Sequence, residues 1–249
     1  MRYAVISDIH GNFEALDAVL GDAAACTDVV LCLGDIVGYG ADPVACVERV
    51  AERAQAITAG NHDHAVAGRL DLDWFNTSAR AALEWTRGHL DADHRAYLGA
   101  LPLVAEVGDA ILVHASPDHP EEWDYLVSAE DGFAAFAAFS TRLCLVGHSH
   151  LPAAWSVGSS GPEFRAGTFE VEFAAGRRYI VNVGSVGQPR DRDPRAAYGL
   201  WDVERGTLAI RRVAYDVERA RRCCVHKLTA EGKLMPFCLY NMKYRRQGC

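Results

Sequence analysis

The sequence predicts an α/β fold on two observations. Residues 1–63 alternate short apolar runs with segments of helical spacing, and residues 151–213 consist mainly of short apolar runs between turns that contain Gly and Pro. Alternation of strand, helix, strand, helix and strand on this scale is typical of parallel pairing with right-handed crossovers. We therefore expect a parallel sheet with helices in the N-terminal half and a second, mainly antiparallel sheet in the C-terminal half.

The individual elements follow from periodicity and from turn residues. Pro43 stands in the first turn of an expected helix, where proline is tolerated. Helices are expected at residues 12–24, 43–53, 76–100 and 129–139. Strands are expected at residues 2–7, 28–33, 55–59, 103–107, 110–114, 142–146, 153–157, 169–173, 178–183, 197–203 and 207–213. No internal repeat or long linker interrupts the chain, so a single domain is the simplest organisation.

Composition excludes several classes of protein. The chain has 249 residues, of which 50% are hydrophobic and 23% charged, as in a globular protein and unlike a disordered or fibrous chain. No apolar run approaches the ~20 residues of a membrane span. The N-terminal residues lead directly into a predicted strand, without the features of a signal peptide. The expected location is the cytoplasm, with no membrane partner.

Charge is unevenly distributed along the chain. Because residues 214–249 contribute +5 to the formal net charge of −8, residues 1–213 carry −13. An acidic body disfavours binding along a nucleic-acid backbone, which needs many basic contacts. It does not exclude a small phosphorylated substrate if a local positive centre is present; nucleic acid would enter only as a substrate, and self-association is left open. The basic tail, 214–249, is expected to be partly helical or disordered, with a nucleic-acid or partner contact as the alternative.

The eight cysteines show neither a disulfide framework nor a C-x-x-C pair. A zinc ribbon and a thioredoxin-like redox motif are therefore not supported. Cys223 and Cys224 are adjacent, and two reduced thiols are favoured over a strained vicinal disulfide in a cytosolic chain.

Five polar clusters each stand where a predicted strand ends, the place where ligands bind in open α/β sheets. They are Asp8-Ile9-His10, Gly34-Asp35, Gly60-Asn61-His62-Asp63, His114 and Gly147-His148-Ser149-His150. Their side chains offer imidazole, carboxylate and amide donors and no thiolate, a set that suits divalent metals of intermediate hardness. The seven candidate ligands are Asp8, His10, Asp35, Asn61, His114, His148 and His150.

Seven donors favour two metal ions over one. A single ion could not use seven protein ligands and still admit water, whereas two ions about 3.5–4 Å apart and bridged by one carboxylate could. Such a pair would attract phosphate oxygens and activate a water molecule for hydrolysis of a phosphate ester. Mn²⁺ is the expected ion, with Fe, Ni, Zn or Mg as alternatives.

These clusters, in this order, resemble the motifs of the calcineurin-like metallophosphoesterase superfamily over residues 1–213. The turn Gly184-Ser185-Val186-Gly187-Gln188-Pro189-Arg190 resembles the smaller bacterial and archaeal phosphodiesterase branch with YfcE-like enzymes. The resemblance implies a four-layer α/β/β/α sandwich of two mixed sheets. It also implies a first metal on Asp8, His10, Asp35 and His150, and a second on Asp35, Asn61, His114 and His148. Asp35 would bridge the ions, and His62 would assist the leaving group after attack by a metal-bridging hydroxide.

The sequence departs from the protein Ser/Thr phosphatases of that superfamily after the second strand. Those proteins have the motif Gly-Asp-x-x-Asp-Arg-Gly. This chain has Gly38 in place of the second aspartate and Tyr39 in place of the arginine. A monoester dianion gains most from a bidentate arginine. We therefore expect a phosphodiesterase; a phosphomonoesterase, a nucleotide or dinucleotide hydrolase, a nuclease and a non-catalytic scaffold like the retromer subunit Vps29 are the alternatives.

Several further residues have two interpretations. Asn12, Tyr39 and Arg190 are candidates for contact with substrate because they stand next to the metal-bearing turns. For Arg190, Arg192 and Arg195 together, ion pairs with Asp191 and Asp193 on a solvated loop are favoured over a substrate channel. Asp63 directly follows His62 and is interpreted as structural.

Overall fold

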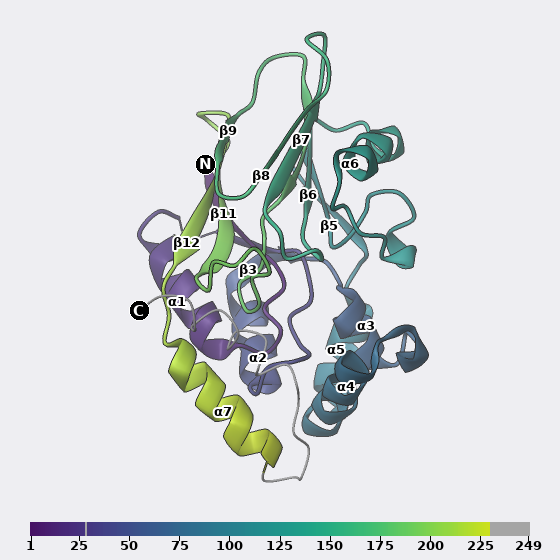
Figure 1. The fold of residues 1–249 in the computed structure, drawn as a ribbon, viewed down its shortest axis with the longest axis vertical. Coiled ribbons are helices and arrows are strands. Elements are labelled where there is room, and N and C mark those ends of the chain that lie inside the picture. Colours follow the sequence, from purple (N-terminus) through teal and green to yellow (C-terminus); the bar gives the residue numbers. More distant parts are fainter. Residues whose placement is uncertain (28, 230–249) are drawn as a thin grey trace.

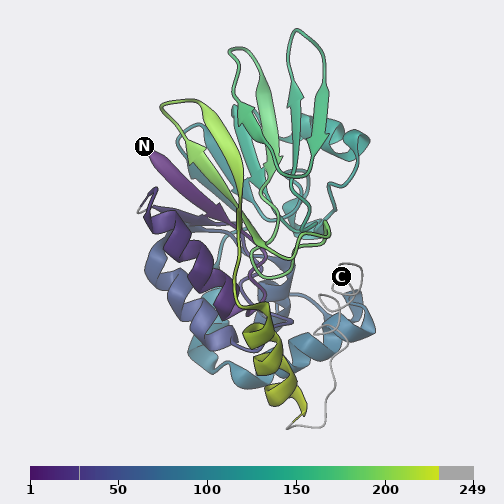
Figure 2. The same ribbon diagram turned by 60° about the vertical axis from the view of Figure 1, so that its left-hand side comes forward.

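The computed structural model describes residues 1–27 and 29–229, with side chains up to Val225. Over these residues the chain forms two six-stranded mixed sheets that face each other, with helices outside both (Figures 1 and 2). The four-layer sandwich expected from the family resemblance is confirmed. Among the described helices, none is long and apolar enough to cross a membrane.

One sheet has the strand order β3-β2-β1-β11-β12-β9, and the other has the order β4-β5-β6-β10-β7-β8. The strands of the first are β1 (Arg2–Ile6), β2 (Val30–Cys32), β3 (Ala54–Ile57), β9 (Glu170–Glu172), β11 (Ala196–Asp202) and β12 (Thr207–Val213). Those of the second are β4 (Val104–Val107), β5 (Ala110–Val113), β6 (Leu143–Val146), β7 (Ala153–Val157), β8 (Glu163–Ala166) and β10 (Arg178–Asn182).

The helices have the following bounds. The α-helices are α1 (Phe13–Ala24), α2 (Pro43–Arg53), α3 (Asn61–Ala67), α4 (Thr77–His89), α5 (Ala92–Ala100), α6 (Ala129–Ala135) and α7 (Val217–Thr229). The short 3₁₀ helices are η1 (Leu72–Trp74), η2 (Pro120–Glu122) and η3 (Phe136–Ala138).

Strand β1 shows how the apolar pattern builds three layers of core. Alternate side chains of a strand point to opposite faces of its sheet. Ala4 and Ile6 pack with α1 and α2, whereas Tyr3 and Val5 pack between the two sheets. A third cluster, which includes Trp155, lies between the second sheet and α6. Helices therefore cover only the outer faces, and the space between the sheets is filled by side chains of strands.

The expected division of the sheets between the two halves of the chain is wrong. β11 pairs antiparallel with β1 and so joins the C-terminal strands to the N-terminal parallel sheet. β10 pairs parallel with β6 in the other sheet. Local apolar patterns identify strands but do not specify partners so distant in the sequence, which is why the sequence did not predict this exchange.

Three other elements differ from the expectation. The helix expected at residues 76–100 is two helices, because Asp91 accepts a hydrogen bond from the His94 amide and caps a new one. Strand β8 was not expected, since all four of its residues are exposed and it lacks apolar alternation. Helix α3 was not expected either, since its seven residues begin with the polar run 61–64.

Helix α7 begins the basic tail and packs beside α1. Arg219 Nε lies 3.3 Å from Glu14 Oε1, and the Cys223 thiol donates to the same oxygen over 3.6 Å. No disulfide joins Cys223 to Cys224, as expected. The remainder of the predicted tail, residues 230–249, lies outside the described residues.

Candidate metal centre

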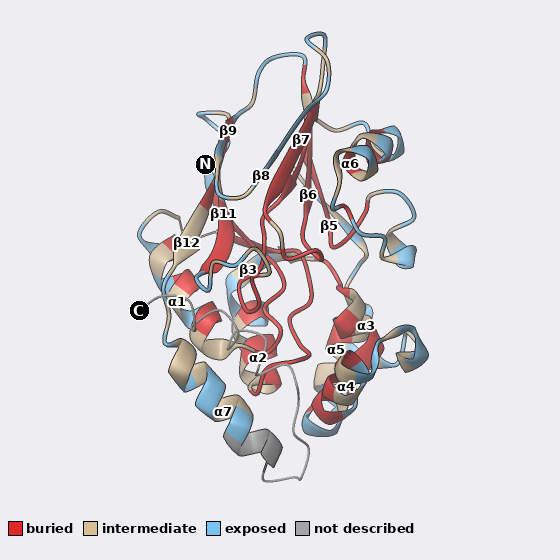
Figure 3. Cartoon of the chain, in the orientation of Figure 1, coloured by how far each residue is buried: buried red, intermediate tan, exposed pale blue. Residues whose placement is uncertain are grey.

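The seven predicted ligands all follow strands of the two sheets. Asp8 and His10 follow β1, Asp35 follows β2, and Asn61 follows β3 as the first residue of α3. His114 follows β5, and His148 and His150 follow β6. Six of these residues are buried and Asn61 is partly buried. Figure 3 shows buried loops where the strand ends meet the helices. The two facing sheets thus bring residues 140 positions apart to the same end of the sandwich.

The backbone at these strand ends is sharply turned. Asp8, His10 and Asp35 have φ angles of 53°, 52° and 51°, and His148 and His150 have φ angles of 63° and 62°. Such angles are costly for residues other than glycine and concentrate at functional sites. Gly147 is required for close approach, because an added Cβ would lie 1.9 Å from Ser7 Oγ and 2.6 Å from Asp8 Oδ2.

Two groups of donor atoms share Asp35. In the first, His150 Nε2 lies 3.3 Å from Asp8 Oδ1. His10 Nε2 lies 3.0 Å from His150 Nε2 and 3.6 Å from Asp35 Oδ2. In the second, His114 Nε2 lies 3.3 Å from Asp35 Oδ2 and 3.2 Å from His148 Nδ1. The Asp35 carboxylate therefore stands between the two groups.

Asn61 is placed by its neighbour in α3. The His62 amide donates to Asp35 Oδ1 over 2.9 Å, which holds the start of α3 against the shared carboxylate. Gly60 allows this approach, since a Cβ there would lie 2.0 Å from Asp35 Oδ1. Among the described residues, the Asn61 Oδ1 atom is buried without a hydrogen-bond partner. An amide oxygen in this state is available to a cation.

The imidazole rings are oriented to offer lone pairs to a cation. The Nδ1 atoms of His10, His114 and His150 lie 3.2, 2.7 and 2.6 Å from the carbonyl oxygens of Val37, Leu33 and Gln188, respectively. Donation of Nδ1–H to a carbonyl leaves Nε2 unprotonated, with its lone pair outward. The facing Nε2 atoms of His10 and His150 would then repel each other unless a cation lay between them. These residues fit divalent metal ions.

Burial and charge set the proton affinities in the protein alone. Burial raises the pKa of Asp8 to about 7 and lowers that of His148 to about 3. Burial opposes protonation of His114, but the carboxylates of Asp35 and Asp8 outweigh it and raise its pKa to about 9. His114 in turn holds the pKa of Asp35 low against the effect of burial. Metal ions would replace these protons as the positive charge of the cluster.

His62 lies beside the donor atoms. Its ring is in edge contact with His10 at a centroid distance of 4.8 Å and with Phe75 at 5.2 Å. Burial lowers its pKa to about 4. A Cβ added to Gly38 would lie 2.3 Å from His62 Nδ1, and this nitrogen has no hydrogen-bond partner among the described residues. Position 38 is thus where a carboxylate would contact His62, and this chain has glycine there.

Asp63 has a structural role, as expected. Its Oδ1 accepts from the Ile36 and Val37 amides over 2.9 and 3.2 Å, and its Oδ2 accepts from the Gly60 amide over 3.0 Å. It thereby ties the loop after β2 to the N-terminus of α3 and keeps Asp35 in place between them.

Asp63→Ala should therefore destabilise the protein. The variant leaves three buried N–H groups without an acceptor, each costing about 1–3 kcal/mol. We expect a loss of roughly 3 kcal/mol or more in the free energy of unfolding, measured by urea denaturation in EDTA. Asp63→Asn, which keeps one carbonyl oxygen, should lose less. Equal unfolding midpoints for Asp63→Ala and the wild type would contradict this role.

The three candidate substrate contacts differ in their surroundings. Asn12 caps α1, with Oδ1 accepting from Ala15 and Nδ2 donating to the Gly187 carbonyl. The Arg190 guanidinium donates to Gln188 Oε1 over 3.1 and 2.8 Å, and its charge opposes the rise that burial causes in the pKa of Tyr39. Tyr39 in turn contacts His62 at a centroid distance of 4.6 Å. Arg190 thus faces the donor cluster, while the polar atoms of Asn12 are engaged within the protein.

The favoured solvated-loop interpretation is wrong for Arg190 and right for Arg195. Arg195 pairs with Asp193 over 2.7 Å, as expected. Asp191 pairs instead with Arg212, from β12. Neighbouring side chains in an irregular loop can point in different directions. An alternation of charges in the sequence does not show which of them pair.

Sequence reasoning also missed aromatic residues of the loop between β5 and α6. The Tyr125 ring stacks on His148 at a centroid distance of 4.0 Å and an interplanar angle of 27°. Trp123 contacts His114 edge-on at 6.1 Å. These residues follow no strand and belong to no motif, so no signal in the sequence placed them here.

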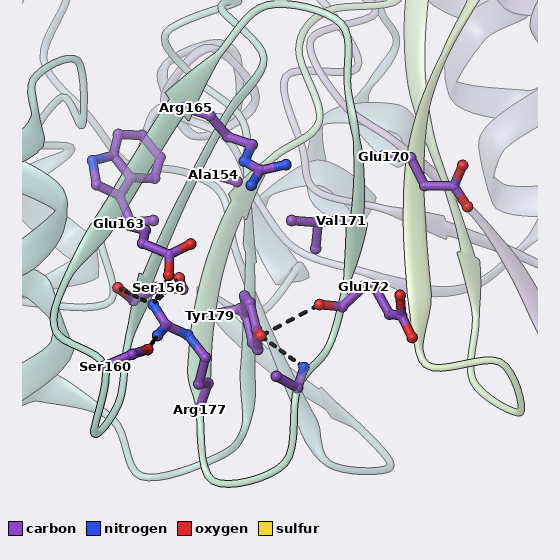
Figure 4. A pocket seen from close by; sticks show the side chains of 12 residues that line it. Ala154, Ser156, Ser160, Glu163, Arg165, Glu170, Val171, Glu172, Arg177 and Tyr179 are labelled. Carbon is purple, nitrogen blue, oxygen red and sulfur yellow. Dashed lines mark hydrogen bonds and ion pairs between the residues drawn. The ribbon is translucent and has the colours of Figure 1, made fainter.

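A pocket of about 420 Å³ is lined by residues of β7, β8, β9 and β10 (Figure 4). None of the predicted site residues lines it. Its buried Arg177 pairs with Glu163 over 3.1 Å and donates to Ser156 Oγ over 2.8 Å. The Tyr179 hydroxyl accepts a hydrogen bond from the Ala174 amide. Arg177 and Tyr179 are thus engaged by the protein itself.

Comparison with known proteins identifies relatives over nearly the whole chain. Residues 1–206 match the model of the calcineurin-like phosphoesterase superfamily domain. The protein MJ0912 of Methanocaldococcus jannaschii is 39% identical over 224 residues, covering 87% of this chain and 89% of its own. A metallophosphoesterase of Sphaerobacter thermophilus is 37% identical, with a TM-score of 0.82 over 98% of this chain and 99% of that one. PH1004 of Pyrococcus horikoshii, 21% identical, shares the fold with a TM-score of 0.74 over 96% and 97%.

Proposed function

Since this chain belongs to the calcineurin-like phosphoesterase superfamily, we propose that it is a phosphodiesterase that uses two divalent metal ions. Membership of the family carries the general activity, hydrolysis of phosphate esters with divalent metals. The number of ions, the diester preference and the roles of individual residues are the proposal. The observation that carries it is the pair of donor groups joined by the Asp35 carboxylate.

The first ion would be held by Asp8, His10, Asp35 and His150, and the second by Asp35, Asn61, His114 and His148. The donor distances support this division. The ligand atoms of Asp8, His10 and His150 lie within 4.8 Å of one another, as do those of Asp35, His114 and His148, and Asp35 Oδ2 is 3.6 Å from His10 Nε2. Mn²⁺ is the proposed ion, consistent with imidazole, carboxylate and amide ligands. Bound ions would supply an activated water molecule and positive charge for the phosphate oxygens.

His62 is the proposed general acid. It is next to the donor groups, its ring orientation is fixed by His10, Tyr39 and Phe75, and its own helix is anchored on Asp35. A proton from this imidazole would reach the leaving oxygen as its bond to phosphorus breaks. Because burial lowers the pKa of the free ring to about 4, an anionic phosphate beside it is needed to keep that proton in place.

The diester preference follows from the charges available to phosphate. Tyr39 stands where a second arginine would bind a monoester dianion, and Arg190 is the guanidinium whose charge acts on Tyr39. One arginine beside the two proposed ions suits the single negative charge of a diester. A monoester carries a second charge, for which the lost arginine would have mattered most.

We expect the protein loaded with Mn²⁺ to cleave bis(p-nitrophenyl) phosphate faster than p-nitrophenyl phosphate. The expected ratio of kcat/KM is about 10 or more, the value of one missing charge-assisted contact to the monoester. Metal analysis of the same sample should give about two ions per chain. A preference for the monoester would overturn the diester assignment, and less than about one ion, with none regained on titration, would favour the scaffold alternative.

The natural substrate is proposed to be small. The acidic body of the chain supports this, since residues 1–213 carry a net charge of −13. A cytoplasmic location is part of the proposal, and its support is that Cys26, Cys32, Cys46 and Cys144 are free thiols.

A further inference from the structure

Tyr125 presents an open aromatic face at the donor cluster. One face of its ring is stacked on the imidazole of His148, and the residue is nevertheless 51% exposed. The covered face cannot account for that exposure, so the opposite face is accessible. An exposed tyrosine next to a candidate metal ligand is placed to contact whatever binds the metals.

The position of Tyr125 is fixed from both sides. Two residues earlier, Trp123 packs edge-on against His114 at 6.1 Å and against His64 at 5.6 Å. One residue later, Leu126 is buried in the core between the second sheet and α6. Ser128 then caps α6 by accepting from the Asp131 amide. A ring held in this way loses little freedom when a ligand stacks on it.

Charged and hydrogen-bonding groups lie on the same side of the cluster. The Tyr39 ring lies against His62 at a centroid distance of 4.6 Å and against His10 at 4.8 Å, and the Arg190 guanidinium is held by Gln188 Oε1. An aromatic face, two hydroxyls and a guanidinium therefore border the cluster together. This combination suits a ligand with a flat ring and an attached phosphate.

We propose that Tyr125 is a stacking platform for the base of a nucleoside phosphodiester. A ring on its outer face, at the usual centroid spacing of about 4.5 Å, would lie roughly 8 Å from the His148 imidazole. A base separated from phosphate by a pentose can reach that position. The proposal rests on the phosphodiesterase function proposed above and names the class of substrate.

The stacked base belongs to the ester group that stays on phosphorus. His62, the proposed donor to the leaving oxygen, contacts His10, whereas Tyr125 contacts His148 in the other donor group. The leaving group must lie next to His62 to receive its proton. The group that reaches Tyr125 is therefore the retained one.

Two esters with the same leaving group test this. Thymidine 5′-(p-nitrophenyl) phosphate and methyl p-nitrophenyl phosphate each lose p-nitrophenol when the P–O bond breaks and water supplies the new oxygen on phosphorus. The wild type should prefer the thymidine ester. Tyr125→Ala should reduce the ratio of the two kcat/KM values about 10-fold, the usual contribution of one base stacked on an aromatic side chain. Tyr125→Phe should keep the ratio.

Phe164→Ala is the matched control, because Phe164 is 41% exposed and contacts Trp155 on β7, outside the donor cluster. Calorimetric titration of the Mn²⁺-loaded protein with thymidine 5′-phosphate gives a readout without turnover. Tyr125→Ala should weaken the binding of thymidine 5′-phosphate about 10-fold. Methyl phosphate should still bind more weakly than thymidine 5′-phosphate. An unchanged ratio and unchanged binding in Tyr125→Ala would overturn the platform. If the wild type cleaved neither ester yet bound thymidine 5′-phosphate through Tyr125, the phosphodiesterase function would fail and the platform would stand.

Discussion

Asp35→Asn should lower kcat/KM for bis(p-nitrophenyl) phosphate by about 1,000-fold or more, because stabilisation by the metal pair amounts to several kcal/mol in the transition state. The Asp35 carboxylate lies 3.6 Å from His10 Nε2 in one donor group and 3.3 Å from His114 Nε2 in the other. Asparagine keeps an oxygen that accepts from the His62 amide, so the start of α3 remains anchored. It removes the negative charge that two neighbouring cations need between them.

The far-UV circular dichroism of Asp35→Asn should match that of the wild type, and its metal content should fall below two ions per chain. Asp17→Asn is a matched control, since Asp17 is an exposed aspartate on α1 that pairs with Arg49 over 2.9 Å. This control should keep full activity and full metal content. Full activity in Asp35→Asn would end the two-metal mechanism.

The metal cluster was predictable because its geometry follows from a local rule. Apolar strands were visible as short runs, and polar residues at their ends had to converge if the strands were parallel. The pairings of β1 with β2 and of β5 with β6 are parallel, and Asp8, Asp35, His114 and His148 follow these four strands. Parallel pairing brings Asp8 to Asp35 and His114 to His148, and the two pairs meet because the two sheets face each other, which only the family resemblance predicted.

The positions of Arg190, Tyr39 and Tyr125 around the donor cluster were not predictable, because they depend on long-range contacts. Arg190 reaches Tyr39 across 150 positions, through a loop after β10 whose course depends on the pairing of β11 with β1. The sequence instead predicts that the strand at residues 197–203 belongs to the second sheet. Tyr125 depends in the same way on Trp123 and Leu126, which anchor an irregular loop by packing against distant side chains. Long-range packing of irregular segments leaves no periodic signal in a sequence.

One turn of the chain holds both a candidate phosphate contact and a contact of a candidate metal ligand. Arg190 lies in this turn, and its charge opposes the rise that burial causes in the pKa of Tyr39. Gln188 fixes that guanidinium through two hydrogen bonds and, through its own carbonyl, orients His150. The turn 184–190 thus couples the position of a candidate phosphate contact to that of a candidate metal ligand.

His62→Ala should slow catalysis in a manner that depends on the leaving group. Loss of a general acid typically costs about 10²–10⁴ in rate, and the cost is greatest where the leaving oxygen is most basic. We expect a loss of about 100-fold or more for methyl phenyl phosphate and a clearly smaller one for methyl p-nitrophenyl phosphate, whose leaving group departs readily as an anion. Comparison of kcat for the two esters measures the difference.

The metal content of His62→Ala should equal that of the wild type, because His62 is beside the donor groups and is not one of the seven proposed ligands. His94→Ala is the control: His94 lies on α5, where it pairs with Asp91 over 2.7 Å, and this variant should cleave both esters at the wild-type rate. Equal losses for the two esters in His62→Ala would show that His62 acts by positioning or by charge. A selective loss with the poorer leaving group requires that the proton come from this imidazole.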